Sequence, residues 1–191
     1  MSSLHFWIFV PGLLVLLFAV AYSQCFWTNF LNSLLVILSS AVAVNYAQLL
    51  ANLINDQAPD WSGFTEFLCM WVVFIIVFLI AKLICNQLSK FPVRTGKKQD
   101  PIFDWIGCGL VTLVMYCWIC FTFLASPVGE EGFNNMMRSG LPSSAGRAYG
   151  FVVFQLPSEF GMNLGGQKFD VQQYAKARLD RAADEANHDG S

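Results

Sequence analysis

Charged residues are scarce in this chain, and basic residues are absent from its first 81 positions, before Lys82. Charged residues make up only 13% of the 191 residues, whereas a typical soluble domain has about 25%. Hydrophobic residues make up 55%, and the mean hydropathy is +0.51. This composition excludes an ordinary soluble domain and predicts an integral membrane protein.

Catalytic and ligand-binding motifs are also missing. The two histidines, His5 and His188, lie at opposite ends of the chain, and no Ser-His-Asp set, metal-ligand cluster or glycine-rich phosphate loop is present. The net charge of −2 does not fit a nucleic-acid-binding protein, which needs clustered basic residues on one face. We therefore predict no catalytic residue, no cofactor, no metal site and no nucleic-acid partner.

Four long apolar runs dominate the first two thirds of the chain. They cover residues 4–21, 26–54, 64–84 and 105–125. A helix of about 20 residues, rising about 1.5 Å per residue, crosses a hydrocarbon core of roughly 30 Å. Apolar runs of this length without a polar stripe are typical of membrane spans. We predict an all-α integral membrane protein with about four transmembrane helices in a domain 1–126, although the first run is also compatible with incomplete crossing.

The remaining residues, 127–191, are predicted to form a partly helical tail outside the membrane. Residues 130–144 are rich in Gly, Ser, Asn and Pro and predict a loop. Residues 145–156 have apolar side chains at helical spacing, which suits a helix at the membrane surface, with a short strand over 151–154 as the alternative. A capping-box-like start predicts a further helix near 170–186.

The link between the third and fourth runs sets the predicted orientation. It contains four basic residues, Lys90, Arg94, Lys97 and Lys98. The other short connections contain none. Because cytoplasmic loops carry an excess of Lys and Arg, we predict that loop 90–100 is cytoplasmic. Counting spans then places the N-terminus and the tail on the opposite side.

Polar and small residues within the runs are candidate sites of helix packing or gating. These candidates are Asp104, Gly107, Gly109, Asn29 and Asn32. Uncharged polar side chains in a span bond neighbouring helices, and small residues let helices approach closely. A carboxylate near the start of a helix is also favoured by the helix dipole. We interpret the set as packing residues, with a polar-lined pathway as the alternative.

The cysteines offer one redox hypothesis. All six lie in or beside apolar runs, where a cysteine is usually a small buried hydrophobe. Cys117 and Cys120, three residues apart, would share one helix face. A quinone-linked thiol oxidoreductase of the membrane would use such a pair, but it would also need a second pair outside the membrane, and the sequence has none there.

Three stretches of residues 1–126 match a known arrangement. They are Phe26-Trp-Thr-Asn-Phe-Leu-Asn-Ser-Leu-Leu35, residues 71–80 running into 86–90, and Asp104-Trp-Ile-Gly-Cys-Gly109 followed by 120–127. On these stretches the chain resembles the colicin V production protein (CvpA) family of bacterial inner-membrane proteins, and residues 169–178 resemble the tails of some longer members. The resemblance implies a small four-helix inner-membrane protein linked to colicin V export and envelope homeostasis, without an established chemical activity.

These observations favour a non-enzymatic, multi-pass protein of the bacterial inner membrane, acting as a pore, a transporter accessory or a scaffold, with its tail in the periplasm. Besides the lipid bilayer, the expected partners are further copies of the chain or subunits of a membrane complex. Two alternatives remain open. One is the thiol oxidoreductase using Cys117 and Cys120, and the other is an accessory subunit of a larger membrane complex, with the tail docked on a partner.

Overall fold

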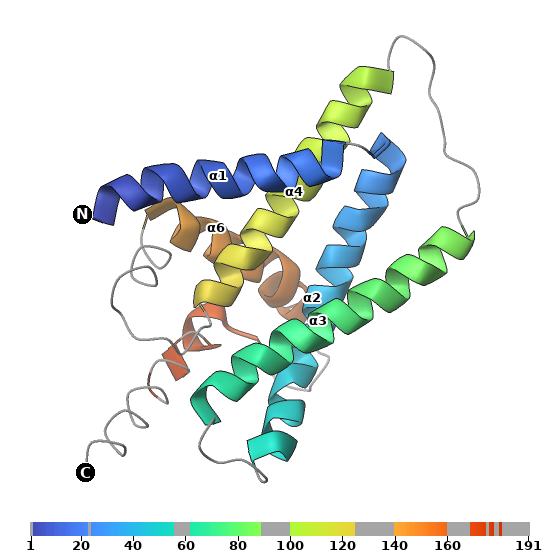
Figure 1. Cartoon of the computed structure of the whole chain (residues 1–191). Coiled ribbons are helices and arrows are strands. Elements are labelled where there is room, and N and C mark those ends of the chain that lie inside the picture. The colour runs from blue at the N-terminus through green and yellow to red at the C-terminus, as the bar shows by residue number, and fades with distance from the viewer. Residues whose placement is uncertain are drawn as a thin grey trace.

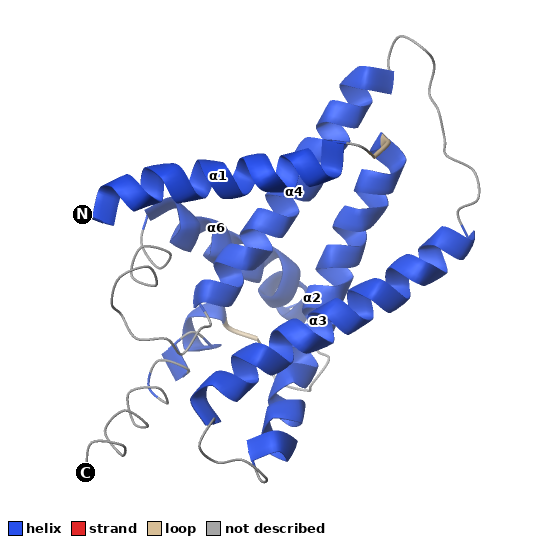
Figure 2. Ribbon diagram, viewed as in Figure 1, coloured by secondary structure: helices blue, strands red, loops and turns tan. Residues whose placement is uncertain are grey.

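The computed structural model describes residues 2–22, 24–55, 62–88, 100–124, 140–159, 169–174, 176–177 and 180. Every regular element in these residues is helical (Figure 2). The elements are α1 (Ser2–Tyr22), α2 (Phe26–Asn55), α3 (Ser62–Leu88), α4 (Asp100–Leu124), α6 (Gly140–Gly150), a π-helical turn η2 (Phe151–Gln155) and α7 (Leu156–Glu159). The all-α prediction is confirmed.

Three helices are long and apolar enough to cross a membrane. They cover Phe26–Ile54, Thr65–Gln87 and Pro101–Leu124. The part of α1 whose side chains are described, Val10–Tyr22, is apolar but shorter, although α1 as a whole is a helix of 21 residues. The number of helices is therefore roughly that predicted, with α1 as the fourth long apolar helix.

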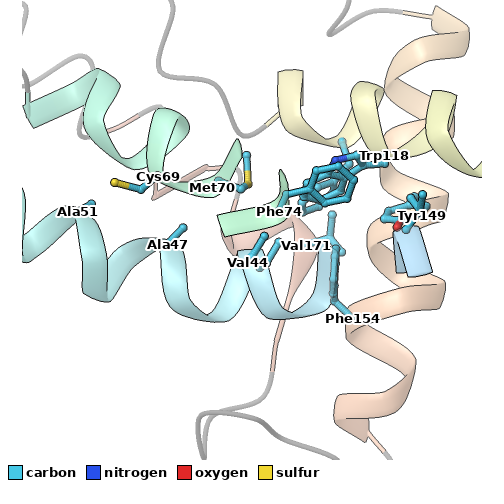
Figure 3. Close-up of a cluster of buried hydrophobic side chains, with 13 residues drawn as sticks. Val44, Ala47, Ala51, Cys69, Met70, Phe74, Trp118, Tyr149, Phe154 and Val171 are labelled. Atoms are coloured by element: carbon cyan, nitrogen blue, oxygen red, sulfur yellow. The ribbon is translucent and has the colours of Figure 1, made fainter. Parts of the chain in front are cut away.

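The helices are arranged around α2 and α4 (Figure 1). These two start at the same end of the molecule, run in the same direction and pack against each other. α3 returns along α2, whereas α1 and α6 pack on α4. The α2–α3 contact uses small residues on the α2 side, since Ala47 and Ala51 face α3 near Cys69 (Figure 3) and are almost completely buried. Small side chains let the two backbones approach closely.

The core is a column of aromatic rings centred on α4. Trp118 and Phe121 are 0% and 1% exposed. The Trp118 ring stacks on Phe74 of α3 with 5.1 Å between ring centroids, and Figure 3 shows these rings beside Tyr149 and Phe154. Further rings contact Trp118 or Phe121, namely those of Trp71, Tyr149, Phe154 and Tyr174. One column therefore joins α3, α4 and the segments that follow α4.

The segment after α4 corrects one sequence-based expectation, the loop over 130–144, and favours the helix predicted over 145–156 against its alternative, a strand over 151–154. The helix α6 begins at Gly140, inside the stretch 130–144 predicted as a loop, and 151–154 form a π-helical turn rather than a strand. Two contacts explain the helix. A Cβ on Gly146 would lie 2.9 Å from the backbone carbon of Cys120, and one on Gly150 would lie 2.9 Å from the Phe121 ring. Close packing on α4 thus overrides the local preference of a Gly- and Ser-rich stretch.

The predicted helix near 170–186 lies only partly within the described residues. Its start is described and is capped, because Asp170 Oδ1 accepts hydrogen bonds from the N–H groups of Gln172 and Gln173, at 2.8 and 3.1 Å. Residues 171–174, 176–177 and 180 are helical. The rest of this stretch lies outside the described residues.

A hydrogen bond fixes α6 to the middle of α2. The hydroxyls of Tyr149 and Ser40 are 2.7 Å apart. Ser40 Oγ also donates to the carbonyl oxygen of Ile37 at 2.8 Å, so its single proton is used. Tyr149 is therefore the donor and Ser40 Oγ the acceptor.

We predict that this bond couples the two helices measurably. Tyr149→Phe, Ser40→Ala and the double variant should give a non-additive free energy of unfolding, with a coupling of about 0.6–1.7 kcal/mol. Reversible unfolding in mixed detergent micelles measures it. Tyr46→Phe is the matched control, because Tyr46 lies on α2 with 51% of its surface exposed, and it should leave stability unchanged. Additive effects of the two substitutions would contradict the bond.

Candidate functional site

The first turns of α2 and α4 meet through a carboxylate. Asp104 Oδ1 accepts a hydrogen bond of 2.5 Å from the backbone N–H of Phe26. Phe26 is the first residue of α2, and the N–H groups at a helix start have no acceptor within their own helix. A negative charge at that end is also favoured by the helix dipole. Asp104, although it belongs to α4, therefore caps α2.

Gly107 allows this approach. A Cβ on Gly107 would lie 3.0 Å from Phe26 Cα and 3.1 Å from its carbonyl oxygen, which are backbone atoms that cannot move aside easily. By contrast, Gly109 is exposed, and within the described part of the chain a Cβ there would meet no atom within 4 Å. Of the two glycines singled out by sequence, only Gly107 lies at the α2–α4 contact.

The two asparagines hold the turn between α1 and α2. Asn29 is 0% exposed, and its Nδ2 donates to the carbonyl oxygens of Ala21 and Gln24, at 3.1 and 3.3 Å. Asn32 Nδ2 donates to Gln24 Oε1 at 2.7 Å. The Ala21 carbonyl oxygen, in the last turn of α1, also accepts a hydrogen bond from the N–H of Gln24 at 3.1 Å, so Asn29 adds a second bond to it. Both side chains therefore fix the turn rather than bridge to α4.

Helix α1 contributes a third side of this site, which the sequence reasoning missed. Cys108 Sγ, one residue after Gly107, donates a hydrogen bond to the carbonyl oxygen of Phe18 at 3.3 Å. The ring of Trp105 contacts Phe18 and Tyr22, with centroid distances of 5.4 and 5.6 Å. The small thiol lets α1 lie against α4. The only sequence signal was the position of Cys108 between two glycines.

Some buried polar atoms have no hydrogen-bond partner among the described residues. They are Asn29 Oδ1, Ser39 Oγ, Thr112 Oγ1 and Trp118 Nε1. All four belong to α2 or α4, and each can form a hydrogen bond with a buried water or another small polar group. They are the only observation in the described part of the chain that bears on the alternative of a polar-lined pathway.

The cysteine pair does not have the surroundings of a redox centre. All six cysteines are free thiols. Cys120 is 0% exposed, and Gly146 of α6 lies against its backbone. Thiol–disulfide exchange with another molecule requires that molecule's sulfur to approach the reacting one, and Cys120 is completely covered in this structure. Among the described residues no group of three or more His, Cys, Asp or Glu side chains could hold a metal ion.

The basic residues Lys90, Arg94, Lys97 and Lys98 lie outside the described residues, so the orientation they imply stays a prediction. The neighbouring Lys82 is described. Its Nζ lies 5.6 Å from the centre of the Phe78 ring, one turn closer to the start of α3. The ammonium group thus lies over an aromatic face, a favourable cation–π arrangement.

Comparison with known proteins gives one match. A family model described as Colicin V production protein matches residues 8–141. The match includes all of α2, α3 and α4 and most of α1, and it ends at the second residue of α6. No curated protein and no solved structure matches the chain.

We predict that the two glycines of α4 respond oppositely to the same substitution. Gly107→Ala should destabilise the protein by about 1–3 kcal/mol, because the new methyl group collides with the backbone of Phe26. Gly109→Ala should be neutral or stabilising by up to about 1 kcal/mol, because alanine favours the helix and meets nothing there. Equilibrium unfolding of both variants in the same detergent measures this. Equal effects would mean that α2 does not approach α4 at Gly107.

Proposed function

The chain belongs to the colicin V production protein family, and from that premise we propose that it is a non-enzymatic, multi-pass protein of the bacterial inner membrane that acts as a scaffold or transporter accessory in export or envelope homeostasis. Its membership of this family and its three long apolar helices make it a membrane protein. The role in export, the inner-membrane location and the absence of catalysis are parts of the proposal.

The observation that carries the proposal is that four polar side chains of the apolar helices form hydrogen bonds within the protein. Asp104, Asn29, Asn32 and Ser40 each bond to another helix or to the turn before α2. A pore within one copy of the chain would need such groups to face an open path. Here they hold helices together, which supports a packed scaffold.

One helix offers a surface for partners within the membrane. The second half of α3 exposes a row of large aliphatic side chains, Ile75, Ile76, Leu79, Ile80, Leu83 and Ile84. In the proposal, lipid covers this face when the protein is alone. A second copy or another membrane subunit would pack there when a complex forms. Such an association would depend on shape, because lipid is as apolar as these side chains.

The proposed orientation keeps loop 90–100 in the cytoplasm and the end of α4 towards the periplasm. The parallel course of α2 and α4 (Figure 1) fits the alternating spans on which the count rests, because two spans separated by one returning helix run in the same direction. The positive-inside rule then assigns the start of both helices to the cytoplasmic side.

Complementation tests the role in export. The chain would be expressed in a colicin V-producing strain that lacks its own family member, and colicin V activity would be measured in the culture supernatant. The wild type and Gly109→Ala should restore release. Gly107→Ala and Asp104→Ala should reduce release several-fold, because each weakens the α2–α4 contact and losses of 1–2 kcal/mol lower abundance several-fold. Immunoblots of the membrane fraction record the amount of each variant.

Two outcomes would contradict the proposal. If the wild type accumulates in the membrane without restoring release or resistance to envelope stress, the proposed role is wrong. If Cys117→Ser with Cys120→Ser abolishes release at normal abundance, the thiol chemistry is required and the protein is not a passive scaffold. We expect this double variant to release colicin V in proportion to its amount in the membrane, because Cys120 is fully buried, so the new hydroxyl lowers stability without removing a reactive thiol.

A further inference from the structure

The length of α2 fixes which of its residues lie in the hydrocarbon layer. The helix has 30 residues and is about 45 Å long, whereas the layer needs about 20 residues. For any placement in which an upright α2 crosses the layer, roughly residues 36–45 lie inside it. A tilted helix needs more residues to cross, so tilting only widens this stretch. Ser40 is therefore inside the hydrocarbon layer in every such placement.

Helix α4 gives the same result independently. Its apolar span, Pro101–Leu124, has 24 residues. With about 20 residues needed to cross, roughly residues 105–120 lie in the layer in every placement. Trp118 and Cys120 belong to this stretch.

Helix α6 contacts both of these stretches. Tyr149 donates to Ser40, and its ring lies 6.0 Å from that of Trp118. A Cβ on Gly146 would lie 3.0 Å from the carbonyl oxygen of Cys120. Two spans thus place the second half of α6 at the depth of the hydrocarbon layer, although α6 has only 11 residues and is too short to cross it.

The chemistry of this segment fits that depth. From Gly140 to Ser158 the chain has no acidic residue and a single basic one, Arg147. Its outward side chains include Leu141, Phe151 and Val152, which are 72%, 45% and 58% exposed. Arg147 is compatible with this position, because its long side chain can carry the charge towards the headgroups. From Gly140 to Glu159 the chain is continuously helical, so the N–H groups beyond its first turn bond to backbone carbonyls, as a lipid environment requires.

We propose that Gly140–Gln155 is embedded in the membrane, entering the hydrocarbon layer without crossing it, and that lipid acyl chains cover Leu141, Phe151 and Val152. This differs from the extramembrane tail 127–191 predicted from sequence. The segment lies almost entirely beyond the residues that the family model matches. It is therefore a feature of this chain that membership of the family does not supply.

Spin labelling in liposomes tests this depth. A nitroxide is attached to Val152→Cys in a variant whose native cysteines are replaced, and its accessibility to oxygen and to a water-soluble nickel chelate is measured. Leu79→Cys, on the exposed face of α3, is the lipid control, and Asp180→Cys, an exposed polar position, is the aqueous control. The Val152 label should resemble Leu79, with high accessibility to oxygen and low accessibility to nickel. A label that resembles Asp180, or one shielded from both reagents by protein, overturns the proposal.

A second measurement keeps the native cysteines, in case their replacement disturbs folding. A benzophenone amino acid replaces Phe151 in the full chain, and the liposomes are irradiated. Mass spectrometry should then detect lipid adducts at position 151, as at position 79 but not at position 180. Adducts at position 79 without adducts at position 151 would overturn the proposal.

Discussion

The helix start at Phe26 imposes the constraint on which the rest of the structure depends. Its N–H group has no acceptor within α2. The carboxylate of Asp104 supplies the acceptor, and Gly107 lets the two backbones come close enough for the bond to form. This contact holds the start of α2 against the second turn of α4, and both helices run on from it in the same direction (Figure 1). The later contacts between them follow from that alignment.

As one consequence, Ser40 of α2 and Cys120 of α4 lie at the same depth. Phe26 and Gly107 are in contact, and each helix then advances about 20 Å before it reaches Ser40 or Cys120. At that depth Ser40 offers its hydroxyl, and Cys120 offers backbone atoms that a helix can approach closely. Helix α6 uses both, through Tyr149 and Gly146. The aromatic column around Trp118 and Phe121 fills the space beneath it.

The sequence predicted the structure well at positions where the residue type is favoured for a single physical reason. Long apolar runs predicted the helices, and the residue types of Asp104 and Gly107 identified two positions that lie at the α2–α4 contact. The partner of Asp104 was not predictable. An aspartate at this position is already explained by the dipole of its own helix, α4, so nothing in the sequence indicated that it caps α2 instead. The beginning of α6, residues 140–144, was missed because glycine and serine indicate a loop locally, whereas a helix was predicted from residue 145 onward. The spacing of Gly146 and Gly150 was the available signal, since small residues four apart are typical of close helix packing.

The position of α6 is decided by shape more than by polar bonding. Its one hydrogen bond to α2, from Tyr149 to Ser40, contributes about 0.6 kcal/mol by the average for membrane helices. Burial of apolar surface adds little where the competing solvent is itself apolar. Dispersion contacts remain, and these weaken steeply when surfaces separate by even 1 Å. Gly146 and Gly150 bring α6 into close contact with α4, so close that a Cβ at either position would not fit. A stretch with little helical preference can therefore hold a helix in the membrane wherever its glycines match the surface of a span.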